Sequence, residues 1–426
     1  MIRVHRGAGW GRVQLLAPLR HREFRLLWTG MTVSLVGDGA LLVALAWQVY
    51  TLSGAPAAMS AVGVALSVPH VALLLLGGVV SDRFDRRLIL LASDLTRAAC
   101  LAVLALLTIS GNLALWHVFA LAAVFGGASA FFGPAFDAIV PDLVGADDLV
   151  QANALDQFVR PMAMQIGGPA IGGVLVASTG AGWAFAVDAL TFAVSSVCLL
   201  RMERLSPPTE NGSLSMWKEL LVGLGYVRRH VWLWGTFVAA AFTYLLFLGP
   251  TTVLVPYIVK DVLHGSAAEL GLVLTSGGLG AVFAAVTIGQ IGLPKSFITF
   301  MYATWTLATL AVAGYGLAHH AWQLAVACAL VNGFEAAGTV AWATAKQRLI
   351  PNNMLGRVSS VDWFVSIALL PLSYALVAPV AHAVGVQTTL VAAGVLGSLV
   401  TVAFLYLPGM RAAQRSALAE AVTADR

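Results

Sequence analysis

The sequence predicts an all-α, polytopic membrane protein with twelve transmembrane helices in two pseudo-symmetric six-helix bundles. Apolar residues make up 59% of the 426 residues and charged residues only 10%, a composition typical of bilayer-embedded chains. The apolar residues are concentrated in twelve segments, each long enough (about 20 residues) to cross a membrane as a helix. Short patterns in the first half recur in the second, which indicates a duplicated unit.

The segments are joined by short polar connections, apart from one long linker. The expected spans are residues 24–49, 57–80, 88–109, 114–137, 151–177, 182–201, 232–256, 268–291, 296–317, 321–345, 357–382 and 386–407. They divide the chain into a tail at 1–23, a bundle at 24–202, a linker at 203–230, a second bundle at 231–408 and a tail at 409–426. No cleavage-site pattern follows the first tail, so we expect it to be retained.

The linker has two parts. Residues 206–212 read Ser-Pro-Pro-Thr-Glu-Asn-Gly, which is typical of an irregular connection. Residues 215–229 place leucines and a tryptophan on one side of a helix and charged residues elsewhere, which predicts an amphipathic helix on the membrane surface.

Positive charge predicts the orientation. If the N-terminus is cytoplasmic, the inner connections carry nearly all basic residues outside the spans, and the outer connections carry only Lys260. This bias places both termini in the cytoplasm. A preference for arginine over lysine and an abundance of alanine and glycine indicate a GC-rich bacterium, so we expect a multi-pass protein of the bacterial cytoplasmic (inner) membrane.

Composition and motifs exclude several other classes. The net charge of +4 reflects topology, so no nucleic-acid partner is expected. The three cysteines lie apart in apolar segments and the histidines show no ligand spacing, so neither a disulfide framework nor a metal site is expected. No ATP-binding loop and no Ser/His/Asp arrangement occurs, so we expect neither an enzyme nor a cofactor.

A charged loop joins the second and third spans. Its arginines suit the cytoplasmic end of a helix, but topology does not explain its aspartates. A carboxylate can bind the positive N-terminal end of another helix, and repeat symmetry places the start of the eleventh span near this loop. We therefore expect a gating contact formed by Gly78, Asp82, Arg83, Arg86, Arg87 and, from the second half, Arg357.

The repeat is clearest around the fourth and fifth spans. Residues 135–141 match 345–351, each ending in proline, and residues 155–159 match 361–365, each with aspartate second. Parallel repeats of this kind predict a substrate site between the halves near the membrane midplane.

The fifth span is rich in small residues. Glycines allow a neighbouring helix to approach closely, and proline removes a backbone hydrogen bond and permits a kink. The residues concerned are Gly168, Pro169, Gly172 and Gly173. Ordinary small-residue packing is the alternative explanation.

The loop pattern Gly-x-x-x-Asp-Arg-x-x-Arg-Arg and the glycine–proline pattern resemble the signatures of twelve-helix drug:proton antiporters of the major facilitator superfamily. Further matches at 37–38, 94–97, 151–155 and 355–358 extend the resemblance over nearly the whole chain, and it is strongest to the branch of macrolide efflux proteins and enterobactin exporters. Met164 stands where the antiporter signature usually begins with glycine. The resemblance implies active export by alternating access, with a cavity lined mainly by helices 1, 4, 7 and 10, and names no substrate.

Three acidic residues within the spans are candidates for proton coupling. Asp38 lies about 18 Å along the first span, near the midplane, and Glu335 lies similarly deep in the tenth. Asp188, near the outer end of the sixth span, is the third candidate. A carboxylate in such a cavity can exchange a proton for substrate, whereas the alternative for Asp38 is a hydrogen-bonded structural carboxylate.

Two other intramembrane acids have a basic residue one helical turn away. Asp94 precedes Arg97 by three positions and Asp156 precedes Arg160 by four. We expect two local ion pairs with a structural role.

Aromatic side chains on the expected cavity helices suit bulky amphipathic or cationic ligands, although most aromatic residues in membrane helices only pack or anchor the helix. The candidate cavity residues are Trp47, Phe125, Phe132, Phe136, Tyr244, Phe247, Asn332 and Trp342.

Together these features predict a monomeric secondary transporter in the lipid bilayer. We expect it to export hydrophobic or amphipathic small molecules (drugs, secondary metabolites or siderophores) in exchange for protons. The alternatives are an uncoupled facilitator or a lipid or amphiphile flippase of the same fold, and a transport-inactive sensor or scaffold. Collapse of the proton gradient distinguishes the proton-coupled exporter from the uncoupled facilitator or flippase.

Overall fold

The computed structural model describes residues 14–203, 216–412 and 414. Within these residues, twelve helical stretches are long and apolar enough to cross a membrane, which confirms the all-α class and the number of spans. The α-helices are α1 (Arg22–Ser53), α2 (Pro56–Arg83), α3 (Arg86–Ile109), α4 (Leu115–Pro161), α5 (Gly168–Thr179), α6 (Ala181–Arg201), α7 (Met216–Arg229), α8 (Val231–Tyr257), α9 (Ala267–Ile291), α10 (Phe297–Ala311), α11 (Ala313–Gly316), α12 (Ala321–Leu349), α13 (Asn352–Ala368), α14 (Leu370–Val384) and α15 (Val386–Leu405). A 3-10 helix, η1 (Gln14–Arg20), precedes α1, and two π-helices, η2 (Met162–Gly167) and η3 (Ile258–Val262), lie within the fifth and seventh spans.

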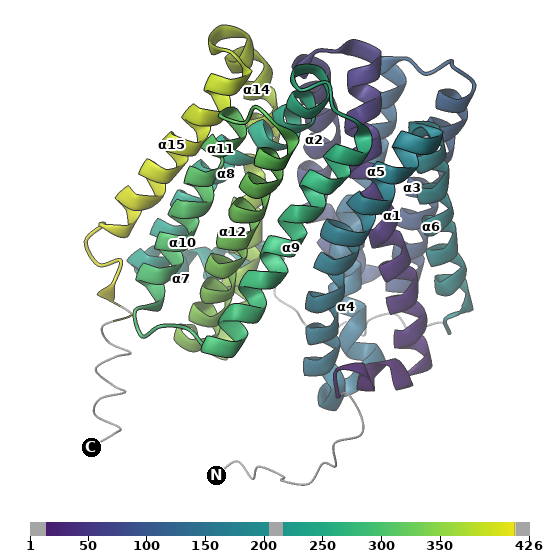
Figure 1. The fold of residues 1–426 in the computed structure, drawn as a ribbon. Coiled ribbons are helices and arrows are strands. Elements are labelled where there is room, and N and C mark those ends of the chain that lie inside the picture. The colour runs from purple at the N-terminus through teal and green to yellow at the C-terminus, as the bar shows by residue number, and fades with distance from the viewer. Residues whose placement is uncertain (1–13, 204–215, 413, 415–426) are drawn as a thin grey trace, which may run out of the picture.

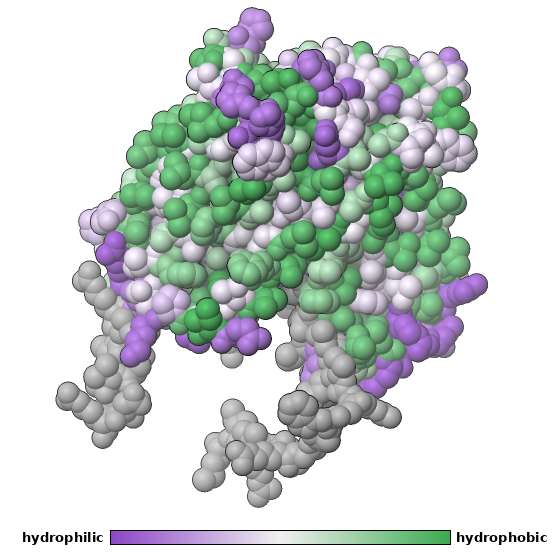
Figure 2. Space-filling view, in the orientation of Figure 1, coloured by the Kyte–Doolittle hydropathy of each residue, from purple (hydrophilic) through white to green (hydrophobic). Residues whose placement is uncertain are grey.

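The helices form two bundles (Figure 1). Helices α1–α6 pack together as the N-terminal half, and α8–α15 pack together as the C-terminal half. We call the end with the start of α1 and the end of α15 the terminal face, and the opposite end the distal face. Figure 2 shows apolar side chains around the middle and hydrophilic ones gathered towards both ends, as expected for a bilayer-spanning protein.

Local sequence explains where several helices begin and end. Asp85 caps α3 by accepting a hydrogen bond of 2.9 Å from the backbone N–H of Arg87. Ser266 and Glu269 form a capping box at the start of α9. Helix α1 stops at Gly54, whose φ of 62° lies in the left-handed region that glycine adopts without strain.

The structure differs from the sequence expectation between the fourth and fifth spans. Residues 138–150, expected to be a polar connection, continue α4 as helix. The polar residues there end the membrane span but are compatible with a helix, so polarity alone did not mark the helix end. The expected amphipathic helix is present as α7, which packs against α8 and α13 with Val227 buried.

The two halves meet in the distal part and the middle of the molecule. Helix α5 packs against α9, α2 packs against α14 and α8, and α1 contacts α8 and α9. Helices α4 and α13, which meet the terminal face, pack mainly within their own halves. The halves are therefore joined towards the distal face and diverge towards the terminal face, as Figure 1 shows.

Candidate functional site

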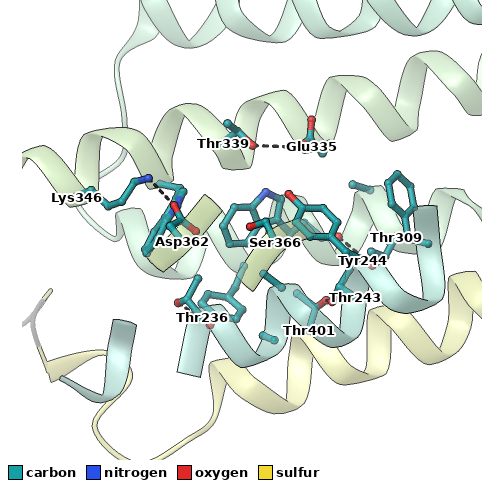
Figure 3. A pocket seen from close by; sticks show the side chains of 17 residues that line it. Thr236, Thr243, Tyr244, Thr309, Glu335, Thr339, Lys346, Asp362, Ser366 and Thr401 are labelled. Atoms are coloured by element: carbon teal, nitrogen blue, oxygen red, sulfur yellow. Dashed lines mark hydrogen bonds and ion pairs between the residues drawn. The ribbon is translucent and has the colours of Figure 1, made fainter. Parts of the chain in front are cut away.

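A cavity of about 340 Å³ lies inside the C-terminal half. Helices α8, α10, α12, α13 and α15 supply its walls. This volume is within the range of pockets that hold drug-sized ligands. Figure 3 shows α12 on one side of the cavity, with Tyr244, Thr243 and Thr401 on the other.

One face of α12 supplies the polar side of the cavity. Glu335, Thr339, Trp342 and Lys346 follow one another at spacings of four, three and four residues, which puts them on one face of an α-helix. This periodicity is visible in the sequence alone. Sequence reasoning missed Lys346 as a cavity residue because topology fully explains a lysine at the end of a span.

Lys346 is neutralised inside the cavity. Its Nζ lies 2.6 Å from Oδ2 of Asp362, and Nε1 of Trp342 donates a hydrogen bond of 2.9 Å to the same oxygen. The ammonium also lies 5.0 Å from the centre of the Trp342 ring, a cation–π distance. Sequence reasoning placed Asp362 only in the internal repeat, opposite Asp156, and did not find this pair.

Glu335 is the third charged residue of the cavity lining. It is half-buried and accepts a hydrogen bond of 3.1 Å from the hydroxyl of Thr339. None of the ion pairs among the described residues includes it. The described lining therefore carries one carboxylate without a cationic partner.

Aromatic rings form much of the remaining wall. Trp342 is held by edge-to-face contacts with Trp232 and Phe237, each with ring centroids 5.9 Å apart. The ring centroid of Trp305 lies 6.4 Å from that of Trp342 and 6.1 Å from that of Tyr302. These interlocked rings give the cavity a rigid apolar surface.

A second polar site lies inside the N-terminal half, where α3 packs against α6. Asp94 and Arg97 form a buried ion pair, and Ser195 donates a hydrogen bond of 2.6 Å to the other oxygen of Asp94. The guanidinium of Arg97 also lies 4.6 Å from the ring of Phe132 and 4.3 Å from that of Phe192. A charge inside a membrane helix has no water to solvate it, and these contacts take the place of that solvation.

Asp188 and Asp38 lie beside this ion pair. Asp188 is fully buried; Thr191 donates a hydrogen bond of 3.0 Å to its Oδ1, whereas its Oδ2 has no partner among the described residues. A methyl group at Gly37 would lie 2.0 Å from that Oδ1, so only glycine lets the α6 carboxylate reach α1 next to Asp38. Both carboxylates interact electrostatically with Arg97. The structure thus brings two of the three candidate acids together.

The other expected ion pair is also present. Arg160 Nη2 lies 3.2 Å from Asp156 Oδ1, with the arginine side chain 41% exposed. This pair is therefore more accessible to solvent than Asp94 and Arg97.

The remaining expected cavity residues are divided among several sites. Tyr244, Phe247 and Trp342 line the C-terminal cavity. Trp47 does not line it and instead contacts the C-terminal half near the distal face. Asn332 also lies elsewhere and donates a hydrogen bond of 2.9 Å to the carbonyl of Cys328 within α12.

The aromatic residues of α4 pack within the N-terminal half. Phe136 is buried in the core, and Phe132 stacks on it with centroids 5.9 Å apart. Phe125 contacts Phe192 edge-to-face at 6.1 Å. A packed helix face and a cavity-lining face have the same aromatic composition, so the sequence could not separate them.

The charged loop is bound to the N-terminal half by two of its arginines. Arg86 donates to the carbonyl of Ala138 at 2.9 Å and pairs with Asp142 at 2.5 Å. Arg87 donates to the carbonyls of Leu199 and Leu200 at 2.6 and 2.9 Å, which satisfies the C-terminal end of α6. The surroundings of Gly78 and the side chains of Asp82, Arg83 and Arg357, the other expected members of the gating contact, lie outside what the structure describes.

The glycine–proline segment lies where three helices cross. A methyl group at Gly168 would lie 2.5 Å from the Cα of Gly39 on α1, and one at Gly172 would meet Ala40. A methyl group at Gly173 would lie 2.9 Å from the Cα of Gly271 on α9. This segment therefore packs within its own half and also joins the two halves. The turn before Pro169 is the π-helix η2, as expected where proline removes a backbone donor.

Residues 13–423 match the family model described as transmembrane secretion effector. The chain belongs to this family, a branch of the major facilitator superfamily. The match covers nearly the whole chain and confirms the resemblance that the loop and glycine–proline patterns carry.

Relatives of this chain are efflux proteins by name. It is 29% identical to the enterobactin exporter EntS of Shigella boydii over 401 residues, which cover 90% of this chain and 92% of the exporter. It is 29% identical to EntS of Citrobacter koseri over 352 residues, covering 80% and 81%. It is 23% identical to macrolide efflux protein A of Streptococcus pyogenes over 378 residues, covering 88% and 93%. The chain is accordingly a multi-pass transporter of the inner membrane.

Solved structures confirm the fold. The nucleoside transporter NupG superposes with a TM-score of 0.68 at 12% identity, covering 90% of this chain and 98% of NupG. A bacterial homologue of the iron transporter ferroportin, in an inward-facing state, gives a TM-score of 0.65 at 15% identity, covering 91% and 99%. Identities this low establish the architecture alone.

Proposed function

We propose that this protein is a proton-coupled exporter of hydrophobic or amphipathic small molecules, working by alternating access between its two halves. The observation that carries the proposal is the position of the Asp188 carboxylate against Gly37, next to Asp38 and near the guanidinium of Arg97. Neighbouring carboxylates held away from water form sites that take up and release a proton. Asp38 and Asp188 are therefore assigned to proton coupling.

The terminal face is the cytoplasmic face in this proposal. The connections there carry Arg86, Arg87, Arg201 and Lys295, whereas the distal connections contribute Lys260. Because basic residues remain on the cytoplasmic side, this bias supports cytoplasmic termini. The structure, in which the halves diverge towards the terminal face, then corresponds to the state that takes up substrate from the cytoplasm.

The cavity of the C-terminal half is assigned to substrate. Its volume and aromatic walls suit an amphipathic molecule, and relatives named for the export of enterobactin and of macrolides support the outward direction. Both assigned sites lie within one chain, so a monomer suffices.

Efflux of a fluorescent amphipathic dye from cells that express the protein tests this function. Export should exceed that of cells without the protein, and a protonophore should abolish the difference. Export that continues after collapse of the gradient would instead identify an uncoupled facilitator or a flippase. No export of any tested amphiphile would favour a sensor or scaffold.

A further inference from the structure

The cavity in the C-terminal half has an unbalanced charge. Its charged lining residues are Glu335, Lys346 and Asp362. Lys346 and Asp362 contact each other at 2.6 Å, and both side chains are only 16% exposed, so their charges cancel locally. Ionised Glu335 leaves the cavity with one negative charge that no described residue balances.

The neutral polar groups of the lining are largely bonded to one another. The hydroxyls of Thr236 and Tyr302 lie 2.9 Å apart, and those of Thr243 and Thr401 lie 3.2 Å apart. These pairs need no hydrogen bond from a ligand. Among the charged groups of the lining, the carboxylate of Glu335 is the one that no described cation pairs.

The aromatic wall is suited to a positively charged partner. Ring faces attract cations, and the ammonium of Lys346 already lies 5.0 Å from the centre of the Trp342 ring. The absence of a side chain at Gly338 allows a second indole, that of Trp305, to approach α12, because a methyl group at Gly338 would lie 2.4 Å from the Trp305 ring. Trp305 lines the same cavity. Tyr244 and Glu335 also line it, and both are labelled in Figure 3.

We propose that this cavity binds an organic monocation with a bulky aromatic or apolar body, and that Glu335 is its counter-ion. The charge of the ligand balances the one unpaired carboxylate, and its apolar body packs against the rings. An anion of the same shape is rejected, because it would place like charge beside Glu335. This inference rests on the proposed function in one respect: the bound cation is the exported substrate.

Equilibrium binding to the purified full-length protein in detergent, at pH 8 and without any gradient, tests the proposal. The probes are tetraphenylphosphonium and tetraphenylborate, which have nearly the same size and opposite charge. The protein should bind the phosphonium at least about tenfold more tightly than the borate, after subtraction of partition into detergent alone. Equal affinities, or tighter binding of the borate, would overturn the proposal.

Two cavity variants and one control identify the carboxylate. Glu335→Gln should weaken phosphonium binding by about tenfold or more and leave borate binding unchanged or stronger. Lys346→Gln should do the opposite and strengthen phosphonium binding severalfold, because it leaves Asp362 as a second unpaired carboxylate. Glu203→Gln removes an 83% exposed carboxylate at the end of α6 and should change neither affinity. Phosphonium binding that is equal in wild type, Glu335→Gln and Lys346→Gln would contradict the assignment. The Lys346→Gln arm is a gain of affinity, so loss of folding cannot imitate it.

Failure of this inference is separable from failure of the proposed function. Glu335-dependent phosphonium binding in a protein whose export ignores the proton gradient would refute coupling and retain the cavity assignment. Gradient-driven export with no effect of Glu335→Gln on binding would refute the cavity assignment alone.

Discussion

Lys260 of the C-terminal half donates a hydrogen bond of 3.0 Å to the backbone carbonyl of Trp47 in the N-terminal half. Its ammonium also contacts Thr51 and lies 4.7 Å from the centre of the Trp47 ring. Close by, the hydroxyl of Tyr50 donates a hydrogen bond of 2.5 Å to the carbonyl of Val253. These contacts tie the halves together near the distal face, so they have to break before that face can open.

Removing the Lys260 ammonium should favour opening of the distal face. Lys260→Met keeps most of the apolar stem and loses a charge-assisted contact, which is worth about 1 kcal/mol at a half-exposed site. Distances between spin labels at Asn112 and His319, exposed on the distal connections of the two halves, should shift towards longer values in this variant. Lys295→Met, an exposed lysine at the terminal face, is the matched control and should leave the distribution unchanged. Identical distributions in all three proteins would show that Lys260 does not hold the seal.

Gly173 should tolerate no side chain in the present conformation. A methyl group there would lie 2.9 Å from the Cα of Gly271 and 2.9 Å from the carbonyl oxygen of Ala267, both backbone atoms of α9. Gly173→Ala should therefore separate α5 from α9, destabilising the distal-closed state by about 1–3 kcal/mol. The same labels should report a longer distal distance. Gly133→Ala is the control, because its new methyl group meets no atom within 4 Å and should be neutral or slightly stabilising. A wild-type distance distribution in Gly173→Ala would mean that this crossing does not restrict the conformation.

Removing one partner of the ion pair between Lys346 and Asp362 should lower the stability of the protein more than removing both. Asp362→Asn leaves the ammonium unpaired in a largely buried position, which should cost about 1–3 kcal/mol and lower the melting temperature of the purified protein. The double variant Lys346→Met/Asp362→Asn should recover much of that loss, since no unpaired charge remains. Thermal unfolding of the two single variants, the double variant and wild type measures the coupling. Strict additivity would rule out a stabilising interaction between these side chains.

Much of the architecture could be predicted from the sequence. The bilayer requires every spanning helix to have a minimum length, and basic connections tend to remain on the cytoplasmic side of the membrane. The contacts that define the sites depend instead on which helices pack together. Nothing local to Asp38 indicates that Asp188, 150 positions later, lies against Gly37. The shared face of the charged residues on α12 could have been predicted, because their helical periodicity is a property of the sequence. The pairing of Lys346 could not, because its partner Asp362 lies on the next helix.

Asp82 remains the predicted latch of the terminal face. If it binds the start of α13 near Arg357 when that face closes, Asp82→Asn should favour the terminal-open state by about 1–3 kcal/mol. Spin labels at the exposed positions Glu203 and Gln290, one in each half, should then show a smaller closed population than in wild type. Loss of transport with an unaltered distance distribution would refute the latch.

Proton coupling through Asp38 and Asp188 predicts that substitution of either carboxylate abolishes gradient-driven transport without abolishing substrate binding. Asp38→Asn removes the titrating group while leaving the cavity of the C-terminal half intact, so substrate binding should stay within about threefold of wild type. Gradient-driven transport should be lost, because the substituted side chain can no longer exchange a proton. Asp188→Asn should behave in the same way.

The decisive measurement is accumulation of a cationic dye in proteoliposomes with an acidic lumen, with the membrane potential clamped at zero by potassium and valinomycin. Wild-type protein should concentrate the dye only while the pH gradient lasts, and the lumen should lose protons as the dye enters. Asp38→Asn should show neither dye accumulation nor dye-dependent proton loss. Dye accumulation and proton loss in Asp38→Asn and Asp188→Asn equal to those of wild type would contradict the assignment of proton coupling to these two carboxylates.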